Sequence, residues 1–334
     1  MALAALKKAA KLPLHIAALL TTAKDFSRNP VIGNHVLNRM GLHVARVCLA
    51  HGIFAFKKML LSPLATKEQR KAFARDGFVV MENALPPEIF EKLKHDAENY
   101  NGEAYQCAQG DTLTWRAVLL DHPVMRDKKT SNLMRYCAGK YERPRFYIQQ
   151  IQNGFLNNPG DPQKNLHVDC FHPTMKAWLF LEDVEADNGA FTFVPGSHRL
   201  TKQRLKWEYD RSLEAANDAD SYSARGSFRV EDGTCEKLGL PQPQGLAVKA
   251  NTLVVANTFG FHCRGKTREK KMTRMEVFAI SRINPFNPVP WGCLEGLRDK
   301  IYLTMMRKGE KDSVTGKKRA SWRKAPPHPV KDAA

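Results

Sequence analysis

Cysteine pairs, long apolar runs and internal repeats are absent from this sequence. Its seven cysteines are scattered, odd in number and without a CxxC pair, which excludes a zinc-finger pattern and argues against a disulfide framework. We therefore expect an intracellular, reducing compartment. No RNP-like strand with stacking aromatic residues is present, so nucleic acid is not an expected partner. The lack of a repeat excludes solenoids and propellers.

No stretch is apolar enough to predict a helix that spans a membrane, which needs about 20 mainly apolar residues. The nearest candidate, residues 35–56, is interrupted by His35, Arg39, His43 and Arg46, whose spacing gathers them on one narrow helical face. One interpretation is a helix lying in the membrane interface with its basic side toward the headgroups. An amphipathic helix packed on the body or on a second subunit is an equal interpretation.

An organelle import peptide is a third interpretation of the N-terminal region, because no acidic residue precedes Asp25. Lysines in place of arginines, and the lack of a small-residue cleavage site after a compact apolar stretch, do not favour it. We expect an intracellular, cytoplasmic protein, for which peripheral association with a membrane is one of two equal interpretations.

Positive charge is concentrated at the two ends of the sequence. The formal net charge is +18. Residues 1–80 hold thirteen Lys/Arg against three Asp/Glu, and residues 298–334 hold eleven against four, whereas the middle carries 28 against 27. Clustered basic groups attract anions of any identity, so we expect the ends to bind anionic lipid or another acidic partner, with nucleic acid the weaker choice.

Composition and charge divide the sequence into three regions. Residues 1–61 are expected to form a basic, amphipathic helical extension, residues 62–297 the folded body, and residues 298–334 a basic, disordered tail. Within the body, the polar residues 200–245 are expected to be irregular. They either cover the mouth of the site or form a solvated loop without a role.

The expected fold is α+β with a mainly β core. Capping, periodicity and turn residues predict the following elements: a capping-box helix from Thr66 to Gly77, helices from Pro86 and near 131–141, and strands at 78–81, 146–152, 246–256 and 273–281. Short strands separated by Asn-Gly and Pro-Gly turns indicate a double-stranded β-helix (jelly roll, cupin-like). Flanking helices and the N-terminal helical extension complete this prediction.

Three side chains have the chemistry of a metal site. Residues i and i+2 of an extended segment share a face, so His167 and Asp169 can offer an imidazole nitrogen and a carboxylate oxygen to one ion. His262 follows the strand-like run 253–256 and supplies a third ligand. Two histidines and one carboxylate on one face of a metal are typical of a non-haem Fe(II) oxygenase centre.

The residues after Asp169 carry a family resemblance. Trp178-Leu-Phe-Leu-Glu-Asp-Val184 and Asn188-Gly-Ala-Phe-Thr-Phe-Val-Pro-Gly-Ser-His-Arg199 follow it in order. From Thr66 to Pro285 the sequence resembles the phytanoyl-CoA dioxygenase family of Fe(II)/2-oxoglutarate oxygenases. The resemblance implies Fe(II) at His167, Asp169 and His262, 2-oxoglutarate and O₂ as cosubstrates, and ascorbate as a supporting reductant.

The resemblance also implies an arginine for the distal carboxylate of 2-oxoglutarate, which a planar guanidinium matches bidentately. Arg274, on the strand after His262, is the preferred candidate, and Arg264 and Arg268 are competitors in the intervening loop. Trp178 matches the family's tryptophan beside the cosubstrate, although a plain core role is as well supported.

Further residues are weaker candidates or mark departures from the family pattern. Gln150, His172 and Arg264 are candidates for contacts with the substrate or with the metal ligands, and His198 is expected to brace the Pro-Gly-Ser-His corner. Cys263-Arg264 stands where many members have Gly-Ser after the distal histidine, so the usual cosubstrate contact from that serine hydroxyl is not expected. Asp169 is retained, which favours hydroxylation over halogenation.

Three interpretations of function follow. The first is an Fe(II)/2-oxoglutarate-dependent hydroxylase that acts on a lipid, acyl chain or glycolipid at a membrane face. The second is a soluble dioxygenase that acts on an acyl-CoA or a small metabolite, with the N-terminal helices in a dimer contact. The third is a jelly-roll protein that binds a ligand without turnover.

Overall fold

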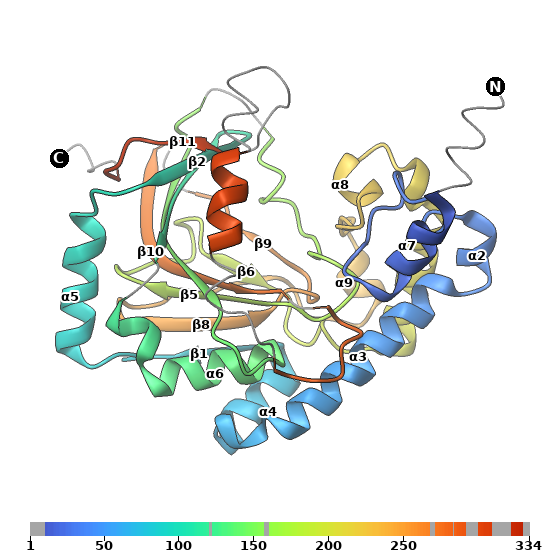
Figure 1. Cartoon of the computed structure of the whole chain (residues 1–334), viewed down its shortest axis with the longest axis horizontal. Coiled ribbons are helices and arrows are strands. Elements are labelled where there is room, and N and C mark those ends of the chain that lie inside the picture. The colour runs from blue at the N-terminus through green and yellow to red at the C-terminus, as the bar shows by residue number, and fades with distance from the viewer. Residues whose placement is uncertain are drawn as a thin grey trace.

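Two antiparallel β-sheets form the centre of the molecule (Figure 1). The computed structural model describes residues 11–119, 122–156, 160–267, 271–282, 284–291, 300–308 and 322–329. The larger sheet has the strand order β1-β8-β5-β10-β4-β3-β2-β11, and the smaller has the order β7-β6-β9. The mainly β, jelly-roll prediction is confirmed.

The strands are short, as their turn-rich sequence predicted. They are β1 (Phe78–Met81), β2 (Ala104–Gln109), β3 (Thr112–Leu119), β4 (Arg145–Asn153), β5 (Met175–Phe180), β6 (Phe191–Phe193), β7 (Gln244–Gly245), β8 (Thr252–Asn257), β9 (His262–Arg264), β10 (Met272–Ser281) and β11 (Arg323–Lys324). The predicted strand 246–256 is shorter at its start, where Val248 makes an isolated bridge to Val184.

The two faces of the larger sheet bury different clusters. On one face, α4 (Lys67–Asp76), α5 (Pro87–Glu98) and α6 (Lys128–Ala138) pack with residues such as Val277 and Ala279 of β10. On the other face, Phe278 and Trp178 pack against Phe191 of the smaller sheet. Alternation along β10 thus directs every second side chain into the space between the sheets.

Several predicted elements agree with the structure in detail. α4 begins with a complete capping box, in which Thr66 and Gln69 each bond the other's backbone N–H. It ends at Gly77, whose φ of 88° is the left-handed conformation that favours glycine. α5 begins with Pro87 in its first turn, as the Pro86-Pro87 pair predicted.

The prediction that the basic and imidazole residues of 35–46 share one helix face is wrong. Gly41, with a φ of 95°, separates α2 (His35–Arg39) from α3 (Leu42–Leu60), so the four basic and imidazole residues do not share one helix. His43 and Arg46 are buried against the body instead of facing outward. His43 Nε2 lies 2.8 Å from the buried Glu208 carboxylate, and Arg46 donates to the carbonyl oxygens of Leu19, Thr21 and Ala23.

The solvent face of α3 is apolar. Its exposed residues recur at helical spacing and carry no charge. They are Ala45, Cys48, Leu49, Gly52, Ala55, Phe56, Met59 and Leu60. We call this set the α3 stripe. A helix that buries its arginine and exposes its leucine and phenylalanine has the reverse of the usual arrangement in a water-soluble protein.

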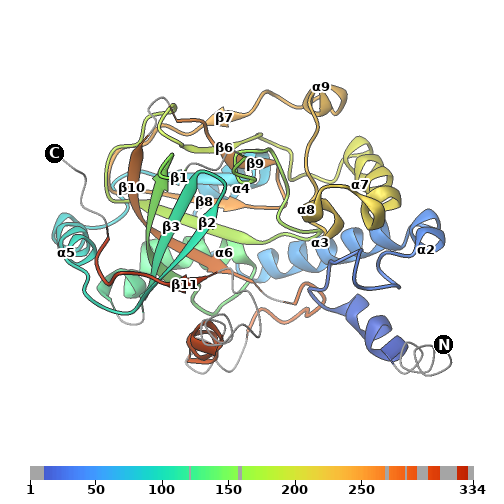
Figure 2. The same ribbon diagram turned by 90° about the horizontal axis from the view of Figure 1, so that it is seen from above.

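The insert 200–245 is helical, which corrects the prediction of irregular structure. It contains α7 (Lys202–Glu214), α8 (Ser221–Ala224) and α9 (Thr234–Lys237). α7 begins with a Thr201 side-chain cap and packs beside α2 and α3 (Figure 2). The described residues that line the cavity between the sheets include none from this insert, so it is not a cover for that cavity.

The C-terminal region is partly ordered, which corrects the prediction of a disordered tail. Residues 300–308 are helical, and β11 pairs with β2. The Trp115 indole donates to the Pro326 carbonyl oxygen at 2.9 Å. The expectation of disorder at 309–321 and 330–334 lies outside the described residues. In the part of the chain that the structure describes, no helix is long and apolar enough to cross a membrane.

Candidate metal centre

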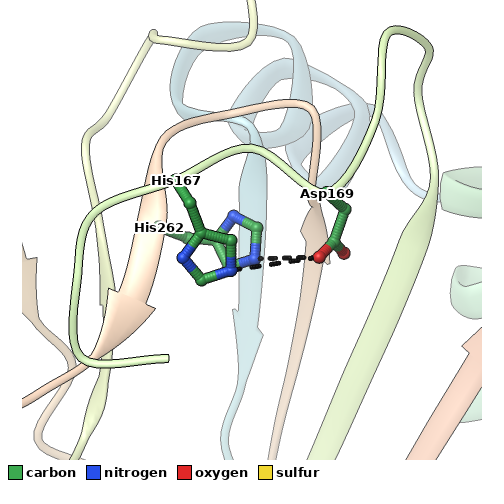
Figure 3. A group of neighbouring side chains, drawn as sticks. All are labelled: His167, Asp169 and His262. Carbon is green, nitrogen blue, oxygen red and sulfur yellow. Dashed lines mark ion pairs between the residues drawn. The ribbon is translucent and has the colours of Figure 1, made fainter. Parts of the chain in front are cut away.

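His167, Asp169 and His262 converge on one point (Figure 3). One nitrogen of each histidine and one carboxylate oxygen all lie within 4.8 Å of one another. The Asp169 Oδ1 atom is 4.0 Å from His167 Nε2 and 3.7 Å from His262 Nε2. The structure thus brings together the three residues that the sequence indicated.

Backbone pairing positions the two histidines. The His167 N–H donates to the His262 carbonyl oxygen and the His262 N–H donates to that of His167, both at 3.0 Å. The Asp169 N–H donates to the Thr258 carbonyl oxygen at 3.0 Å. The ligand segment predicted as a strand is therefore an extended loop, in which His167 makes isolated bridges to Arg229 and to His262 at the start of β9.

The imidazole orientations fit a metal ion. His167 Nδ1 lies 2.7 Å from the Asn165 carbonyl oxygen, and His262 Nδ1 lies 2.9 Å from that of Gly260. These bonds place the proton of each neutral ring on Nδ1. Each Nε2 atom then carries a lone pair that faces Asp169. His262 Nε2 is buried and has no hydrogen-bond partner, a costly state for a polar atom unless a ligand binds it.

Electrostatics favour the ionisation states that metal ligands need. Burial lowers the pKa of His262 to about 4, and burial together with His262 lowers the pKa of His167 well below 6.5. Burial opposes ionisation of Asp169, but Lys176 and the two histidines hold its pKa well below 3.8. Two neutral imidazoles and one carboxylate are the donor set that divalent iron takes.

Lys176 is the residue of this centre that the sequence reasoning missed. Its Nζ lies 3.0 Å from Asp169 Oδ1 and 2.7 Å from Oδ2. It is on β5, two residues before Trp178, so both side chains face the same cavity. The sequence feature that could have indicated Lys176 is its place as a charged residue within an otherwise apolar strand.

The three ligands lie at the wall of a cavity of about 330 Å³ between the two sheets. Arg274 lines it and is buried, as predicted for the cosubstrate arginine. Its Nε donates to Glu276 Oε2 at 2.9 Å, and its Nη1 donates to the Gly189 carbonyl oxygen. A buried carboxylate therefore fixes this guanidinium, which the sequence did not indicate.

Two further arginines line the same cavity. Arg264 donates to the fully buried Asp161 carboxylate at 2.7 Å. Arg116 donates to Gln149, whose amide in turn donates to Glu276. The Arg116–Gln149–Glu276 chain was not predicted, although all three lie on strands whose alternation directs them inward.

The weaker candidates lie in different places. Trp178 lines the cavity and packs on Phe191, with ring centroids 4.2 Å apart. Gln150 is on the opposite face of β4 from Gln149, because neighbouring strand residues alternate, so its predicted role at the site is not supported. Arg268 lies outside the described residues.

His172 does not line the metal cavity, which corrects its assignment as a candidate there. It lines a separate cavity of about 390 Å³, together with Lys24 of the N-terminal extension and with Asp169. His172 Nδ1 lies 3.1 Å from the Pro173 carbonyl oxygen. His198 is half-buried beside Phe73 and Gly77, a position that fits a bracing role.

Comparison with known proteins agrees with this centre. Residues 73–235 match the family model described as Phytanoyl-CoA dioxygenase (PhyH). A curated relative, the peroxisomal phytanoyl-CoA dioxygenase of Mus musculus, is 24% identical over 213 residues, which are 53% of this chain and 62% of the relative. The chain thus spans less than two thirds of the length of that relative.

Two solved structures have low similarity to this chain. HygX from Streptomyces hygroscopicus with nickel and 2-oxoglutarate bound is 16% identical, with a TM-score of 0.42 over 64% of this chain and 86% of HygX. The epimerase SnoN in complex with Fe³⁺, alpha ketoglutarate and nogalamycin RO is 16% identical, with a TM-score of 0.43 over 66% of this chain and 83% of SnoN.

The family match contains two of the three converging residues, His167 and Asp169, and ends before the third. The structure supplies His262 and Arg274, which lie beyond the matched region but beside it in space. Residues 73–235, and the centre that they help to form, are therefore similar to the phytanoyl-CoA dioxygenase family.

Proposed function

We propose that this protein is an Fe(II)- and 2-oxoglutarate-dependent dioxygenase that hydroxylates an unactivated carbon. The observation that carries this proposal is the pair of Nε2 atoms, each anchored through Nδ1 and facing the Asp169 carboxylate. Bound iron with 2-oxoglutarate would supply the oxidation of the carbon–hydrogen bond. His167, Asp169 and His262 would hold the metal on one face and leave the opposite positions to the cosubstrates.

Other residues would position and shield the reactants. Arg274 would bind the distal carboxylate of 2-oxoglutarate, and Glu276 and the Gly189 carbonyl oxygen fix its guanidinium in advance. Trp178 and Phe191 would exclude water from one side of the metal centre. Lys176 would hold the Asp169 carboxylate in place.

The substrate is proposed to be lipid-like, an acyl chain or a glycolipid, reached at an anionic membrane surface. The α3 stripe supports this, because an uncharged apolar helix face exposed beside basic segments fits the membrane interface. The neighbouring α4 exposes Lys67, Lys71 and Arg75. A soluble dioxygenase that acts on an acyl-CoA or small metabolite is the second candidate, which the polar lining of the metal cavity favours.

Anaerobic titration of the apoprotein with Fe(II) and then 2-oxoglutarate tests the chemistry. We expect a visible metal-to-ligand charge-transfer band that is lost in His167→Ala and His262→Ala. The control variant is His95→Ala, because this side chain is 75% exposed and distant from the ligand set. Folded protein that binds iron without the band, or a band that survives in His167→Ala, would reject the proposal and leave a binding protein without turnover.

A further inference from the structure

The N-terminal extension reaches the loop that carries His167 and Asp169. The contact is made by residues 19–26, which we call the Lys24 segment. The ammonium group of Lys24 donates a hydrogen bond to the main-chain carbonyl oxygen of Asp169, a residue 145 positions further along the chain. A side chain of the extension thus binds directly to one of the three candidate metal ligands.

This bond completes a set of contacts around Asp169. The Asp169 N–H donates to the Thr258 carbonyl oxygen at 3.0 Å, and its carboxylate contacts the Lys176 ammonium group at 3.0 and 2.7 Å. Lys24 engages the remaining polar group, the main-chain carbonyl oxygen. A hydrogen bond from an ammonium group is charge-assisted and stronger than one from a neutral donor. Both the main chain and the side chain of Asp169 are therefore held in place.

Arg46 of α3 fixes one side of the Lys24 segment. Its guanidinium donates to three carbonyl oxygens of the segment, those of Leu19, Thr21 and Ala23, at 2.9, 3.3 and 2.7 Å. The same guanidinium stacks on Phe171, two residues after Asp169, with its Cζ atom 4.1 Å from the ring centroid. Arg46 therefore joins α3 both to the Lys24 segment and to the metal loop, which accounts for its burial.

The insert fixes the other side of the Lys24 segment. The Phe26 N–H donates to the Ala224 carbonyl oxygen at 3.0 Å. Gly226 has a φ of 78°, and a Cβ atom there would lie 2.1 Å from the Lys24 carbonyl oxygen, so glycine alone fits this contact. The Phe26 ring is buried in the same apolar cluster as Val168, the residue between the first two ligands. The Lys24 segment is thus packed between α3 and the insert.

We propose that Lys24 is a positioning residue of the metal centre, so that the N-terminal extension is part of the catalytic unit. Lys24 acts through Asp169: by fixing its main chain, it keeps the carboxylate directed toward the two imidazoles before a metal ion binds. This rests on the proposed function. An import peptide that is cleaved off does not fit this role, because removal of residues 1–24 would remove the contact.

Co(II) binding measures the positioning effect without turnover. The full-length apoprotein would be titrated with Co(II), followed by its visible absorption, for the wild type, Lys24→Met and Lys11→Met. Lys24→Met keeps the aliphatic stem and removes the N–H donors, and Lys11 is an exposed lysine of the same extension. We expect about tenfold weaker binding in Lys24→Met and wild-type binding in Lys11→Met, because residues that orient metal ligands typically contribute about 10–100-fold to affinity.

Chemical rescue separates the lost hydrogen bond from a general loss of structure. Lys24→Ala removes the side chain beyond Cβ, and Lys24 lines the cavity of about 390 Å³ together with Asp169, so a small amine has room to enter. Propylammonium, which has the length of the missing side chain, should restore Co(II) affinity. Tetramethylammonium carries the same charge but no N–H donor, and should not restore it.

The outcomes distinguish this proposal from the proposed function. Equal Co(II) affinity of Lys24→Met and Lys11→Met, with a wild type that binds Co(II), would overturn the positioning role alone. Equal effects of the two ammonium ions on folded Lys24→Ala would also overturn it. A wild type that binds no Co(II) would reject the metal centre and this proposal with it. Thermal unfolding of the apoproteins shows which variants are folded, and if Lys24→Ala is not, the Lys24→Met titration decides.

Discussion

The Lys176 ammonium group contacts both oxygens of the Asp169 carboxylate, at 3.0 and 2.7 Å. This pair lies between β5 and the loop that carries the first two metal ligands, and its side chains are 16% and 15% exposed. Without a metal ion, Lys176 is the nearest counter-charge for Asp169. The carboxylate therefore has a partner in the apoprotein and keeps its orientation for metal binding.

Removal of Lys176 should make the free energy of unfolding depend more strongly on bound metal. Lys176→Met leaves Asp169 without its counter-charge, and we expect the apoprotein to lose about 2 kcal/mol of unfolding free energy, less than a fully buried pair would lose. Mn(II), a redox-stable substitute for iron, should restore stability more in the variant than in the wild type. Urea unfolding with and without Mn(II) measures both effects.

Lys249→Met is a matched control for this experiment. Lys249 also contacts an aspartate, Asp183, at 2.7 Å, but the two side chains are 84% and 53% exposed. Its loss should change stability by a few tenths of a kcal/mol, with no metal dependence. Wild-type stability of Lys176→Met, or an equal response of both variants to Mn(II), would contradict the role given to Lys176.

Arg274 and Arg264 should differ in their effect on 2-oxoglutarate. Arg274→Met should weaken 2-oxoglutarate binding at least tenfold, because a bidentate charge-assisted contact contributes about 1.5–3 kcal/mol. Arg264→Met should have a smaller effect, since Asp161 already engages the Arg264 guanidinium. Anaerobic titration at saturating Fe(II) gives both affinities. The reverse order would assign the cosubstrate carboxylate to Arg264.

The sequence predicted the ligand set because its three residues obey local rules. His167 and Asp169 need only an extended segment, and His262 needs only the end of a strand. The family resemblance also indicated Arg274 in advance. Glu276 is two residues after Arg274 on β10, so the same local rule places the two on one face, but its contact with Gln149 depends on the register of β4 and β10. Such register is a tertiary property.

The N-terminal region shows where periodicity alone fails. The spacing of His43 and Arg46 correctly predicted that they share a helix face, but not what that face meets. Glu208, 165 residues away from His43, forms a hydrogen bond with it, so this face of α3 packs against α7. The α3 stripe is on the opposite face of the helix from His43 and Arg46. It is therefore exposed when those two residues are buried. A long-range hydrogen bond of this kind leaves no local signal in the sequence.

His198 should make stability depend on pH. Burial lowers the pKa of His198 to about 4, below the 6.5 of an unfolded histidine. The unfolded state therefore takes up a proton first as pH falls, and the stability that the neutral ring retains above pH 6.5 is lost progressively toward pH 4. At pH 5 the loss should be about 2 kcal/mol from this residue alone.

The variant His198→Gln isolates this contribution. Its unfolding free energy should fall less between pH 7 and pH 5 than that of the wild type, whatever its absolute stability. His95→Gln, at a side chain 75% exposed, should keep the wild-type pH dependence. Urea titrations at both pH values measure the difference, and identical slopes for His198→Gln and wild type would refute the assignment.

The α3 stripe should control membrane binding. Leu49 and Phe56 are 51% and 47% exposed, so Leu49→Glu and Phe56→Glu should leave folding intact. Each apolar side chain contributes about 1.5–3 kcal/mol when it leaves water, and the double variant should bind anionic vesicles at least a hundredfold more weakly. Sedimentation with phosphatidylcholine–phosphatidylserine vesicles measures this.

Val289→Glu is the matched control, because Val289 is 48% exposed but lies outside α3. It should sediment with vesicles as the wild type does. High salt should weaken wild-type binding without abolishing it, because the basic groups of α4 are screened whereas burial of the stripe is not. If instead the wild type is a dimer that the double variant dissociates, and neither binds vesicles, the stripe joins two copies of this chain and the membrane proposal fails.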